Sequence, residues 1–524
     1  MDETLTPQVL AQLAQPGAYP EDPSALGGVE WVQTHISHVF LTADRVYKFR
    51  KAVDLGFVCF ATRAERNADC LRELSLNRRL APDVYLGLAP LEIQGDRVQA
   101  GSVREKIAPG AEHCVVMRRL APDRDALTLL AKDDLQPDQL DRVARRIAAF
   151  HARHGLGAPT PFSMKAWETR CTRPLEDSLA QLARAPVAVV DRVVLDRVRA
   201  LATAFASQHA GRFERRRRAG RAVDAHGDLH LQHIWFETDH AEPLIIDCLE
   251  FSDELRHIDA AADVAFTSMD LEYRGEHALA ERFLGVYATE RDDFDLYRVV
   301  DYFACYRAVI RAKVAALAAR DPSIEHGQRA RAAVSAQRHL ALADRLFAPR
   351  MGGRLVLVGG IVGTGKSTVA QALAHASGGV VISSDRVRKQ LPDPALYTHA
   401  AKRRVYDALL ERAQPVLESG RMVILDATWN RSAERAAAQL LAAKHGSPCV
   451  FIETRCRADI TQERLALRER EGTDPSDAGP AYHAVSVAEF EAFDEAVEGE
   501  RHAVHTDAPR WERVVARLAD FLTA

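Results

Sequence analysis

The sequence predicts two domains, an α+β domain followed by a three-layer α/β domain built on a parallel sheet. A length of 524 residues is too great for one hydrophobic core, so at least two domains are expected. From residue 354 onward, apolar strand patterns alternate with helical patterns, which is typical of a parallel sheet with helices on both faces. Before residue 348, short strand patterns precede alanine- and arginine-rich helical patterns.

Charge and cysteine content narrow the class of protein. A net charge of -4 gives no general attraction to nucleic acid or to an anionic membrane. The eight cysteines stand singly, with neither a C-x-x-C pair nor a zinc-like spacing, and are expected to be reduced thiols. The sequence shows no signal-peptide pattern and no apolar run of about 18 residues that could span a membrane. These features favour a soluble cytoplasmic protein.

Turn and capping signals predict the elements of the first domain. Residues 1–25 hold a short helical pattern and then several prolines, and we expect a flexible lead-in there. A polar turn between apolar residues 39–41 and 46–49 predicts a β-hairpin. Thr62 and Glu65 form a capping-box pattern, which predicts a helix that ends before Pro82. Further strands are expected near residues 90–93, 98–107, 114–120, 222–225, 234–236 and 244–247, and helices over 138–154, 165–210 and 260–347.

A turn-rich segment at residues 348–353 predicts a linker. It divides the chain into a first domain at residues 26–347 and a second at 354–524. In the second domain, strands are expected at residues 354–359, 380–383, 422–425 and 449–452, with helices between them.

The first strand of the second domain runs into the phosphate-binding-loop pattern of glycine, four residues, then Gly-Lys-Ser. Glycines let the backbone curl so that successive N–H groups face an anion, and the following helix adds its positive N-terminal end. Lys366 is expected to reach the β- and γ-phosphates of ATP, and the Ser367 hydroxyl to bind Mg²⁺. The alternative is a glycine-rich turn between a strand and a helix. The candidate nucleotide-binding residues are Gly360, Gly363, Gly365, Lys366, Ser367 and Thr368.

Two aspartates, Asp385 and Asp426, directly follow predicted strands of this domain. Because ligands gather at the carboxyl ends of parallel strands, both are expected near the γ-phosphate. Asp385 suits a general base for an acceptor hydroxyl, with Arg388 binding a charge of the acceptor. Asp426 suits a Mg²⁺ ligand acting through water, or a residue that positions the substrate. The alternative for either aspartate is a helix N-cap or a loop residue.

Three arginines, Arg464, Arg468 and Arg470, lie on one predicted helix before a polar loop at residues 471–477. This pattern is typical of a lid that brings guanidinium groups over a transferring phosphoryl, whose charge is spread over several oxygens. We assign Arg464 to nucleotide binding, and Arg468 and Lys366 to catalysis. The alternative is a solvated basic helix.

Together these segments of the second domain resemble the small P-loop kinases that include gluconate kinase, zeta toxins and the kinase domain of polynucleotide kinase. The resemblance extends over about residues 352–524 and rests on the loop, Ser384-Asp-Arg-Val-Arg388, Leu425-Asp-Ala-Thr428 and the arginine-rich helix. It implies ATP-dependent phosphorylation of a hydroxyl.

In the first domain, His226-Gly-Asp228 with His233 and the downstream Ile246-Asp-Cys-Leu-Glu-Phe251 resembles the catalytic centre of aminoglycoside phosphotransferases and choline kinase-like enzymes. Those enzymes have a protein-kinase-like fold, and similar domains occur fused to a P-loop kinase in bacterial bifunctional proteins. The resemblance covers about residues 25–345 and implies the following roles. The base is Asp228, and the metal ligands are His233 and Asp247, with Glu250 as a supporting carboxylate. Lys48 and Glu73 are the pair that binds the phosphates of ATP. The segment Met117–Leu120 is the hinge beside the adenine.

Two departures weaken the implied activity of this domain. His233 stands where these enzymes have a metal-binding asparagine, and imidazole is a softer, titratable Mg²⁺ ligand than an amide oxygen. No Gly-x-Gly-x-x-Gly loop is present. Three interpretations of this domain therefore stay open, namely a catalytically active kinase, a nucleotide- or ligand-binding pseudokinase, and a chance resemblance.

The sequence thus favours a phosphotransferase with two nucleotide sites, which transfers the γ-phosphoryl group of Mg-ATP to a hydroxyl of a small molecule. One alternative is a nucleotide-regulated binding protein whose first domain is catalytically silent. A further alternative is a nucleic-acid 5′-hydroxyl kinase, against which the sequence pI of about 6.6 weighs.

Overall fold

The computed structural model describes residues 5–54, 58–238, 240–348, 350, 353–391, 399–471, 480–493 and 499–523. The contacts of the chain group it into two compact units. Unit 1 comprises Met1–Arg146, Arg153–Leu156 and Ala222–Asp263, and unit 2 comprises Ile147–Ala152, Gly157–Arg221 and Val264–Ala524. The segment at residues 348–353 belongs to unit 2, and the domain boundary expected there stays a prediction.

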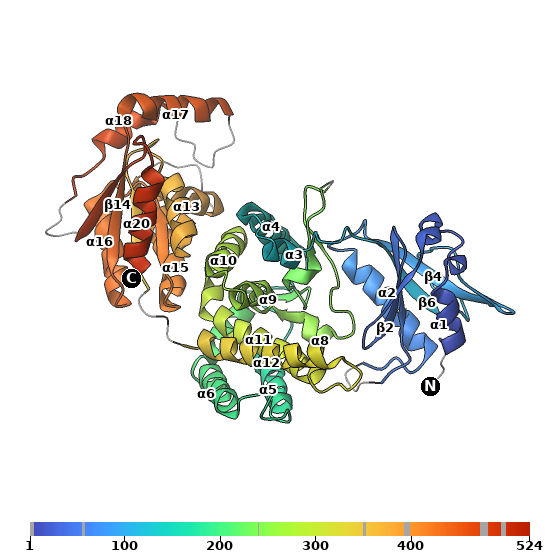
Figure 1. Ribbon diagram of the computed structural model, residues 1–524. Helices are drawn as coiled ribbons and strands as arrows, with labels where there is room; N and C mark the ends of the chain where they lie inside the picture. Colours follow the sequence, from blue (N-terminus) through green and yellow to red (C-terminus); the bar gives the residue numbers. More distant parts are fainter. Residues whose placement is uncertain are drawn as a thin grey trace. The chain divides into compact units, whose positions relative to one another are not determined.

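Unit 1 is built on a six-stranded antiparallel sheet with the strand order β1-β2-β3-β6-β4-β5. Its strands are β1 (Glu30–Gln33), β2 (Ser37–Leu41), β3 (Arg45–Arg50), β4 (Tyr85–Gln94), β5 (Arg97–Ala100) and β6 (His113–Arg118). Helix α2 (Arg63–Asn77) packs against β4 and β6 (Figure 1). The predicted hairpin is β2–β3, and the capping box of Thr62 and Glu65 starts α2.

The expected flexible lead-in over residues 1–25 is wrong for the part that the structure describes. Helix α1 (Pro7–Leu13) and the short helices η1 (Pro16–Ala18) and η2 (Pro23–Gly27) pack into the core of the six-stranded sheet. Leu13 and Tyr19 are buried there with Phe40 and Phe49. Pro7, Pro16 and Pro23 begin these short helices, so they mark ordered turns and not mobility.

Two short strand pairs carry the loops that hold candidate site residues of unit 1. Strand β7 (Ala222–Asp224) pairs with β10 (His257–Asp259), and β8 (Ile234–Trp235) pairs with β9 (Leu244–Ile245). The loop between β7 and β8 contains His226–His233, and the loop after β9 contains Asp247. The helices here are α3 (Ala126–Ala131), α4 (Pro137–Arg153, which continues into unit 2), η3 (Leu231–His233), α8 (Asp253–Arg256) and the start of α9 (Ala260–Tyr273).

Unit 2 contains a helical part and a parallel sheet. The helical part holds α5 (Met164–Leu182), α6 (Arg192–Gln208), α7 (Ala210–Arg218), α10 (His277–Arg291), η4 (Phe294–Arg298), α11 (Val300–Ala318) and α12 (His326–Leu346). Helix α11 packs along α12 and α5. Among the described helices of the whole chain, none is both long and apolar enough to cross a bilayer.

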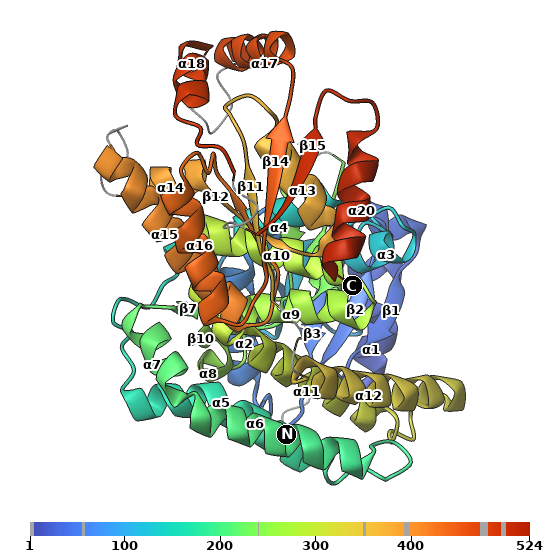
Figure 2. The same cartoon turned by 90° about the vertical axis from the view of Figure 1, so that its left-hand side faces the viewer.

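The parallel sheet of unit 2 has the strand order β12-β13-β11-β14-β15. Its strands are β11 (Leu355–Gly359), β12 (Val380–Ser383), β13 (Val423–Asp426), β14 (Cys449–Arg455) and β15 (Glu500–His505). Figure 2 shows α13 (Lys366–Ser377) and α20 (Trp511–Thr523) on one face of the sheet and α15 (His399–Glu418) and α16 (Ser432–Lys444) on the other. The remaining helices are α14 (Ser384–Gln390), α17 (Ala458–Glu471) and α18 (Pro480–Ala488).

This architecture confirms the predicted fold class. An α+β arrangement of an antiparallel sheet, one packed helix and two loops comes first, and a three-layer α/β fold with a parallel sheet follows. The sheet of the second fold has one strand more than the sequence patterns predicted, β15, which pairs with β14.

Candidate active sites

The phosphate-binding loop joins β11 to α13 in unit 2. Gly360, Gly363 and Gly365 have φ values of 136°, 87° and 86°, in the region that favours glycine. A Cβ at Gly360 would lie 2.5 Å from the carbonyl oxygen of Thr454, so only glycine fits there. Gly365 is the N-cap of α13, and the loop therefore ends at a helix N-terminus, the standard position for binding phosphate.

Three predicted residues meet at the end of this loop. The Ser367 hydroxyl donates a 2.7 Å hydrogen bond to Oδ2 of Asp426, the last residue of β13. The Lys366 ammonium donates to the carbonyl oxygen of Ile361, within the loop itself, at 3.1 Å. Burial lowers the pKa of Lys366, against the opposing effect of Asp426. Burial also raises the pKa of Asp426. Thr368, the next residue of α13, is exposed.

The other predicted residues of unit 2 surround this centre. Asp385, in the first turn of α14, pairs with Arg388 at 3.7 Å, and its charge raises the pKa of Asp426. Arg468 lies near enough to Lys366 for its charge to lower the pKa of that lysine. Arg464 donates to both oxygens of Thr506, at 2.9 Å and 3.0 Å.

Not every part of the predicted lid lies at this centre. The guanidinium of Arg470 is exposed and donates to the carbonyl of Ala466 in its own helix. The polar loop expected after α17 lies outside the described residues from 472 to 477. Thr506, which the sequence did not single out, donates to the carbonyl of Thr364 at 2.8 Å and so connects Arg464 to the phosphate-binding loop.

In unit 1, Lys48 and Glu73 form the predicted ion pair at 2.9 Å. Lys48, on β3, also contacts Oδ1 of Asp247 at 3.2 Å. The Lys48 ammonium holds the pKa of Asp247 below its usual range. The other oxygen of Glu73 accepts from Arg50 at 2.7 Å. Lys48, Glu73 and Asp247 are thus brought together from β3, α2 and the loop after β9.

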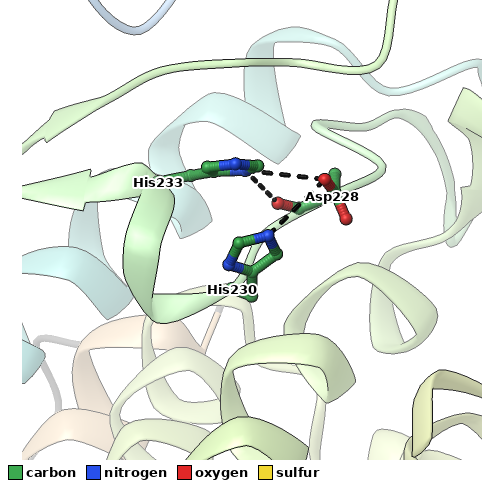
Figure 3. A group of neighbouring side chains, drawn as sticks. All are labelled: Asp228, His230 and His233. Carbon is green, nitrogen blue, oxygen red and sulfur yellow. Dashed lines mark hydrogen bonds and ion pairs between the residues drawn. The ribbon is translucent and has the colours of Figure 1, made fainter. Parts of the chain in front are cut away.

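The loop between β7 and β8 brings Asp228, His230 and His233 together (Figure 3). Oδ2 of Asp228 lies 3.6 Å from Nε2 of His230 and 3.6 Å from Nδ1 of His233. On its other side, Nε2 of His233 lies 3.4 Å from Oδ2 of Asp247. Burial acts to raise the pKa of Asp228, but its hydrogen bond with His230 and the nearby imidazoles hold that pKa below its usual range. Asp228 is therefore ionised at neutral pH.

His226 has a structural position in this loop. Its Nε2 donates to the carbonyl of Ile246 at 2.9 Å, and its Nδ1 accepts from the N–H of Asp228 at 3.3 Å. Burial lowers its pKa to about 4. With both ring nitrogens engaged, His226 orients the loop and is not available as a ligand.

Four residues that the sequence did not single out shape the unit 1 site. Arg50 is fully buried and forms ion pairs with Asp69, Glu73 and Glu250, so the partner of Glu250 in the structure is this arginine.

The other three residues hold the backbone of the loops. Asp263 accepts from the N–H groups of His226 and Gly227 at 3.0 Å and 2.8 Å. The Tyr85 hydroxyl accepts from the Asp247 N–H, and the Asn77 side chain accepts from the Cys248 N–H. The sequence offers little indication of these roles, because each residue is of a common type for the helix, strand or loop in which it lies.

Comparisons with known proteins found matches to most of the chain and to parts of it. A family model described as AAA domain matches residues 355–493. The chain is 34% identical over 510 residues to the uncharacterized protein Rv2004c of Mycobacterium tuberculosis, covering 93% of each. A choline/ethanolamine kinase family protein from Mesorhizobium loti covers 64% of this chain and 99% of its own, at 16% identity and a TM-score of 0.35. A gluconokinase from Sinorhizobium meliloti covers 33% of this chain and 97% of its own, at 23% identity and a TM-score of 0.25.

Proposed function

The chain belongs to the family of the uncharacterized Mycobacterium tuberculosis protein, and from its two sites we propose that it is an ATP-dependent phosphotransferase acting on small-molecule hydroxyls in the cytoplasm. The observation that carries the proposal is the contact of Ser367 with Asp426 at the end of the glycine loop of unit 2. A hydroxyl and a carboxylate beside a helix N-terminus are what a nucleotide phosphate and its cation require.

The donor set of unit 2 fits Mg²⁺, because Ser367 and Asp426 both offer oxygen. Mg²⁺, when held there, supplies charge neutralisation at the β- and γ-phosphates. Lys366, whose ammonium donates to a loop carbonyl in the structure, is positioned to exchange that contact for phosphate oxygens. Arg468, whose charge acts on Lys366, adds positive charge for the transferring group.

In the proposed reaction the bond between the γ-phosphorus and the β,γ-bridging oxygen breaks, and a bond to the acceptor oxygen forms. Asp385 accepts the proton of the acceptor hydroxyl in unit 2, and Arg388 holds a negative charge of the acceptor. In unit 1 the corresponding base is Asp228, whose lowered pKa keeps it ionised, and Lys48 grips the nucleotide phosphates beside Glu73. Both sites act by positioning and charge stabilisation, without a covalent intermediate.

The test for unit 2 is phosphorylation by the Lys366→Ala variant. The full chain is incubated with γ-labelled ATP and a cell metabolite extract, and labelled compounds are identified. We expect the unit 2 product to fall at least about 100-fold, because the phosphate contact of Lys366 is lost. Lys444→Ala, an exposed change in the same unit, serves as the control. Equal ATP turnover by the Lys366→Ala variant and the parent would refute the assignment.

The test for unit 1 is made in the Lys366→Ala background, which isolates its activity. Asp228→Asn keeps the size of the side chain but removes its basicity, so any remaining phosphorylation should disappear. Asp96→Asn, in the exposed turn between β4 and β5, is the matched control. Unchanged residual phosphorylation in the Asp228→Asn variant would exclude Asp228 as the base.

A second function is favoured by one observation, the imidazole of His233 beside Asp247. In this alternative, unit 1 binds a nucleotide or another ligand without catalysis, and the nucleotide state of the phosphate-binding loop regulates that binding. The two functions differ in turnover at unit 1. Metal-linked ATP binding with residual phosphorylation in the Lys366→Ala chain supports the enzyme, and binding without phosphorylation supports the regulated binding protein.

A further inference from the structure

His233 is held in one orientation by a single backbone contact. Its Nδ1 lies 2.9 Å from the carbonyl oxygen of Asp228, and a carbonyl only accepts, so Nδ1 carries the proton. The lone pair of the neutral ring is therefore on Nε2. An imidazole that donates one N–H to a backbone carbonyl and presents its other nitrogen is the usual arrangement of a metal-binding histidine.

Nε2 of His233 lies close to a carboxylate oxygen, which is also an electron-pair donor. Nε2 lies 3.4 Å from Oδ2 of Asp247, so two acceptor atoms face each other. Two atoms that bind one dication at about 2.0–2.2 Å are separated by roughly 3–3.5 Å at octahedral to tetrahedral angles. The observed separation therefore matches a pair of ligands to one ion.

Further donors lie on the other side of the His233 ring. The ligand atoms of Asp228, His230 and His233 all lie within 4.8 Å of one another. The rings of His230 and His233 are tilted by 36° relative to each other at a centroid distance of 3.9 Å, and Figure 3 shows both turned toward Asp228. These residues face the protonated Nδ1 side of His233, so the pair offered to one ion is Nε2 of His233 and Oδ2 of Asp247.

The backbone of Asp247 has an uncommon conformation that a neighbouring side chain stabilises. Its φ of 62° lies in the left-handed region, which non-glycine residues rarely adopt. The Tyr85 hydroxyl accepts the Asp247 N–H at 3.1 Å and so stabilises that conformation. A backbone conformation of this kind, held in place by a buried side chain, is typical of a functional site.

We propose that Nε2 of His233 and Oδ2 of Asp247 form a site for a borderline transition-metal dication of the manganese-to-zinc class, in preference to Mg²⁺. Mg²⁺ favours all-oxygen sites, whereas imidazole nitrogen favours manganese, zinc and their neighbours. The two units then differ in metal, with Mg²⁺ at the oxygen pair of Ser367 and Asp426. This inference takes only the location of the site from the proposed function and needs no catalytic step.

The test measures the metal directly in the full chain, with Mn²⁺ alone and without nucleotide. Asp426→Asn is used as the background to remove the carboxylate of the unit 2 site. Pulsed electron paramagnetic resonance of bound Mn²⁺ should show coupling to imidazole ¹⁴N in this background. In the His233→Gln variant, a side-chain amide takes the place of the imidazole Nε2. The coupling to imidazole ¹⁴N should then weaken or vanish. His240→Gln, the same change on a histidine that lies beside Glu237, is the control and should keep the coupling.

Competition titrations give a second measurement. We expect His233→Gln to weaken Mn²⁺ binding about tenfold or more while Mg²⁺ binding does not weaken, so that the preference for Mn²⁺ falls. Absence of ¹⁴N coupling in the His233-containing chain would overturn the inference without any variant. An equal loss of Mn²⁺ and Mg²⁺ affinity in His233→Gln would also overturn it. Neither measurement uses turnover. In a chain that phosphorylates nothing, observed coupling would therefore support the metal site, and the missing phosphorylation would refute only the unit 1 kinase activity.

Discussion

The two candidate sites differ in what holds them together. In unit 2, a short run of consecutive residues builds most of the site, with backbone N–H groups, three glycines at positive φ and the start of α13. In unit 1, side chains from β3, α2 and two separate loops build the site through ion pairs and hydrogen bonds. A site made of backbone depends on local conformation, whereas a site made of distant side chains depends on a buried network.

The largest effect is expected from breaking the network of unit 1 at Arg50. Replacing Arg50 by Met leaves the carboxylates of Asp69, Glu73 and Glu250 buried without their shared cation. We expect the free energy of unfolding of unit 1 to fall by about 3–5 kcal/mol. Urea unfolding of the full chain, with hydrogen exchange of β3 and α2 reporting on unit 1, measures the change.

The control for Arg50 is Arg72→Met, whose side chain is 48% exposed and whose loss should cost little. The loss at Arg50 should shrink as the pH is lowered, because the abandoned carboxylates then take up protons and lose their charge. Equal unfolding midpoints for the Arg50→Met and Arg72→Met chains would show that the network does not stabilise the unit.

A smaller effect is expected from the backbone of unit 2. Gly360→Ala introduces a Cβ at a φ of 136° and 2.5 Å from the carbonyl oxygen of Thr454, so the loop must shift. We expect ATP binding at unit 2 to weaken about 100-fold, or about 3 kcal/mol, with unit 1 unaffected. Calorimetric titration of the full chain with ATP measures the loss of one class of sites.

Gly446→Ala separates steric contact from backbone strain in this comparison. Gly446 also has a positive φ, of 62°, but a Cβ there would meet no atom within 4 Å. ATP binding should stay unchanged in that variant. Equal losses of binding in both variants would contradict the close approach of Thr454 as the reason for glycine at position 360.

The same difference decides how far the sequence could predict each site. The loop from Gly360 to Ser367 and the position of Asp426 at the end of β13 follow from spacing and from strand–helix alternation, which are local patterns. The capping box and the hairpin of unit 1 were predicted for the same reason. The ion pair of Lys48 and Glu73 was predicted only through family resemblance, because nothing local indicates that pairing.

What the sequence could not predict depends on contacts between distant segments. Arg50 and Glu250 are separated by 200 positions along the chain, and no pattern in either segment indicates their contact. Asp263 is an acidic residue in an alanine-rich helix until the fold brings the N–H groups of His226 and Gly227 to it. The lead-in was misjudged because its proline and glycine signals were weighted above its apolar positions, which pack against the sheet.

The smallest effect tests whether single hydrogen bonds matter in the side-chain site. Tyr85→Phe removes the hydroxyl that accepts the Asp247 N–H and leaves the ring in the core. The cost should be about 1 kcal/mol, so Mn²⁺ binding at unit 1 should weaken about fivefold. Tyr47→Phe removes another buried hydroxyl of the same unit, one that donates to Asp22, and should leave Mn²⁺ binding unchanged. If both variants bind Mn²⁺ like the parent, the left-handed backbone of Asp247 is maintained without Tyr85, and the network tolerates the loss of this bond.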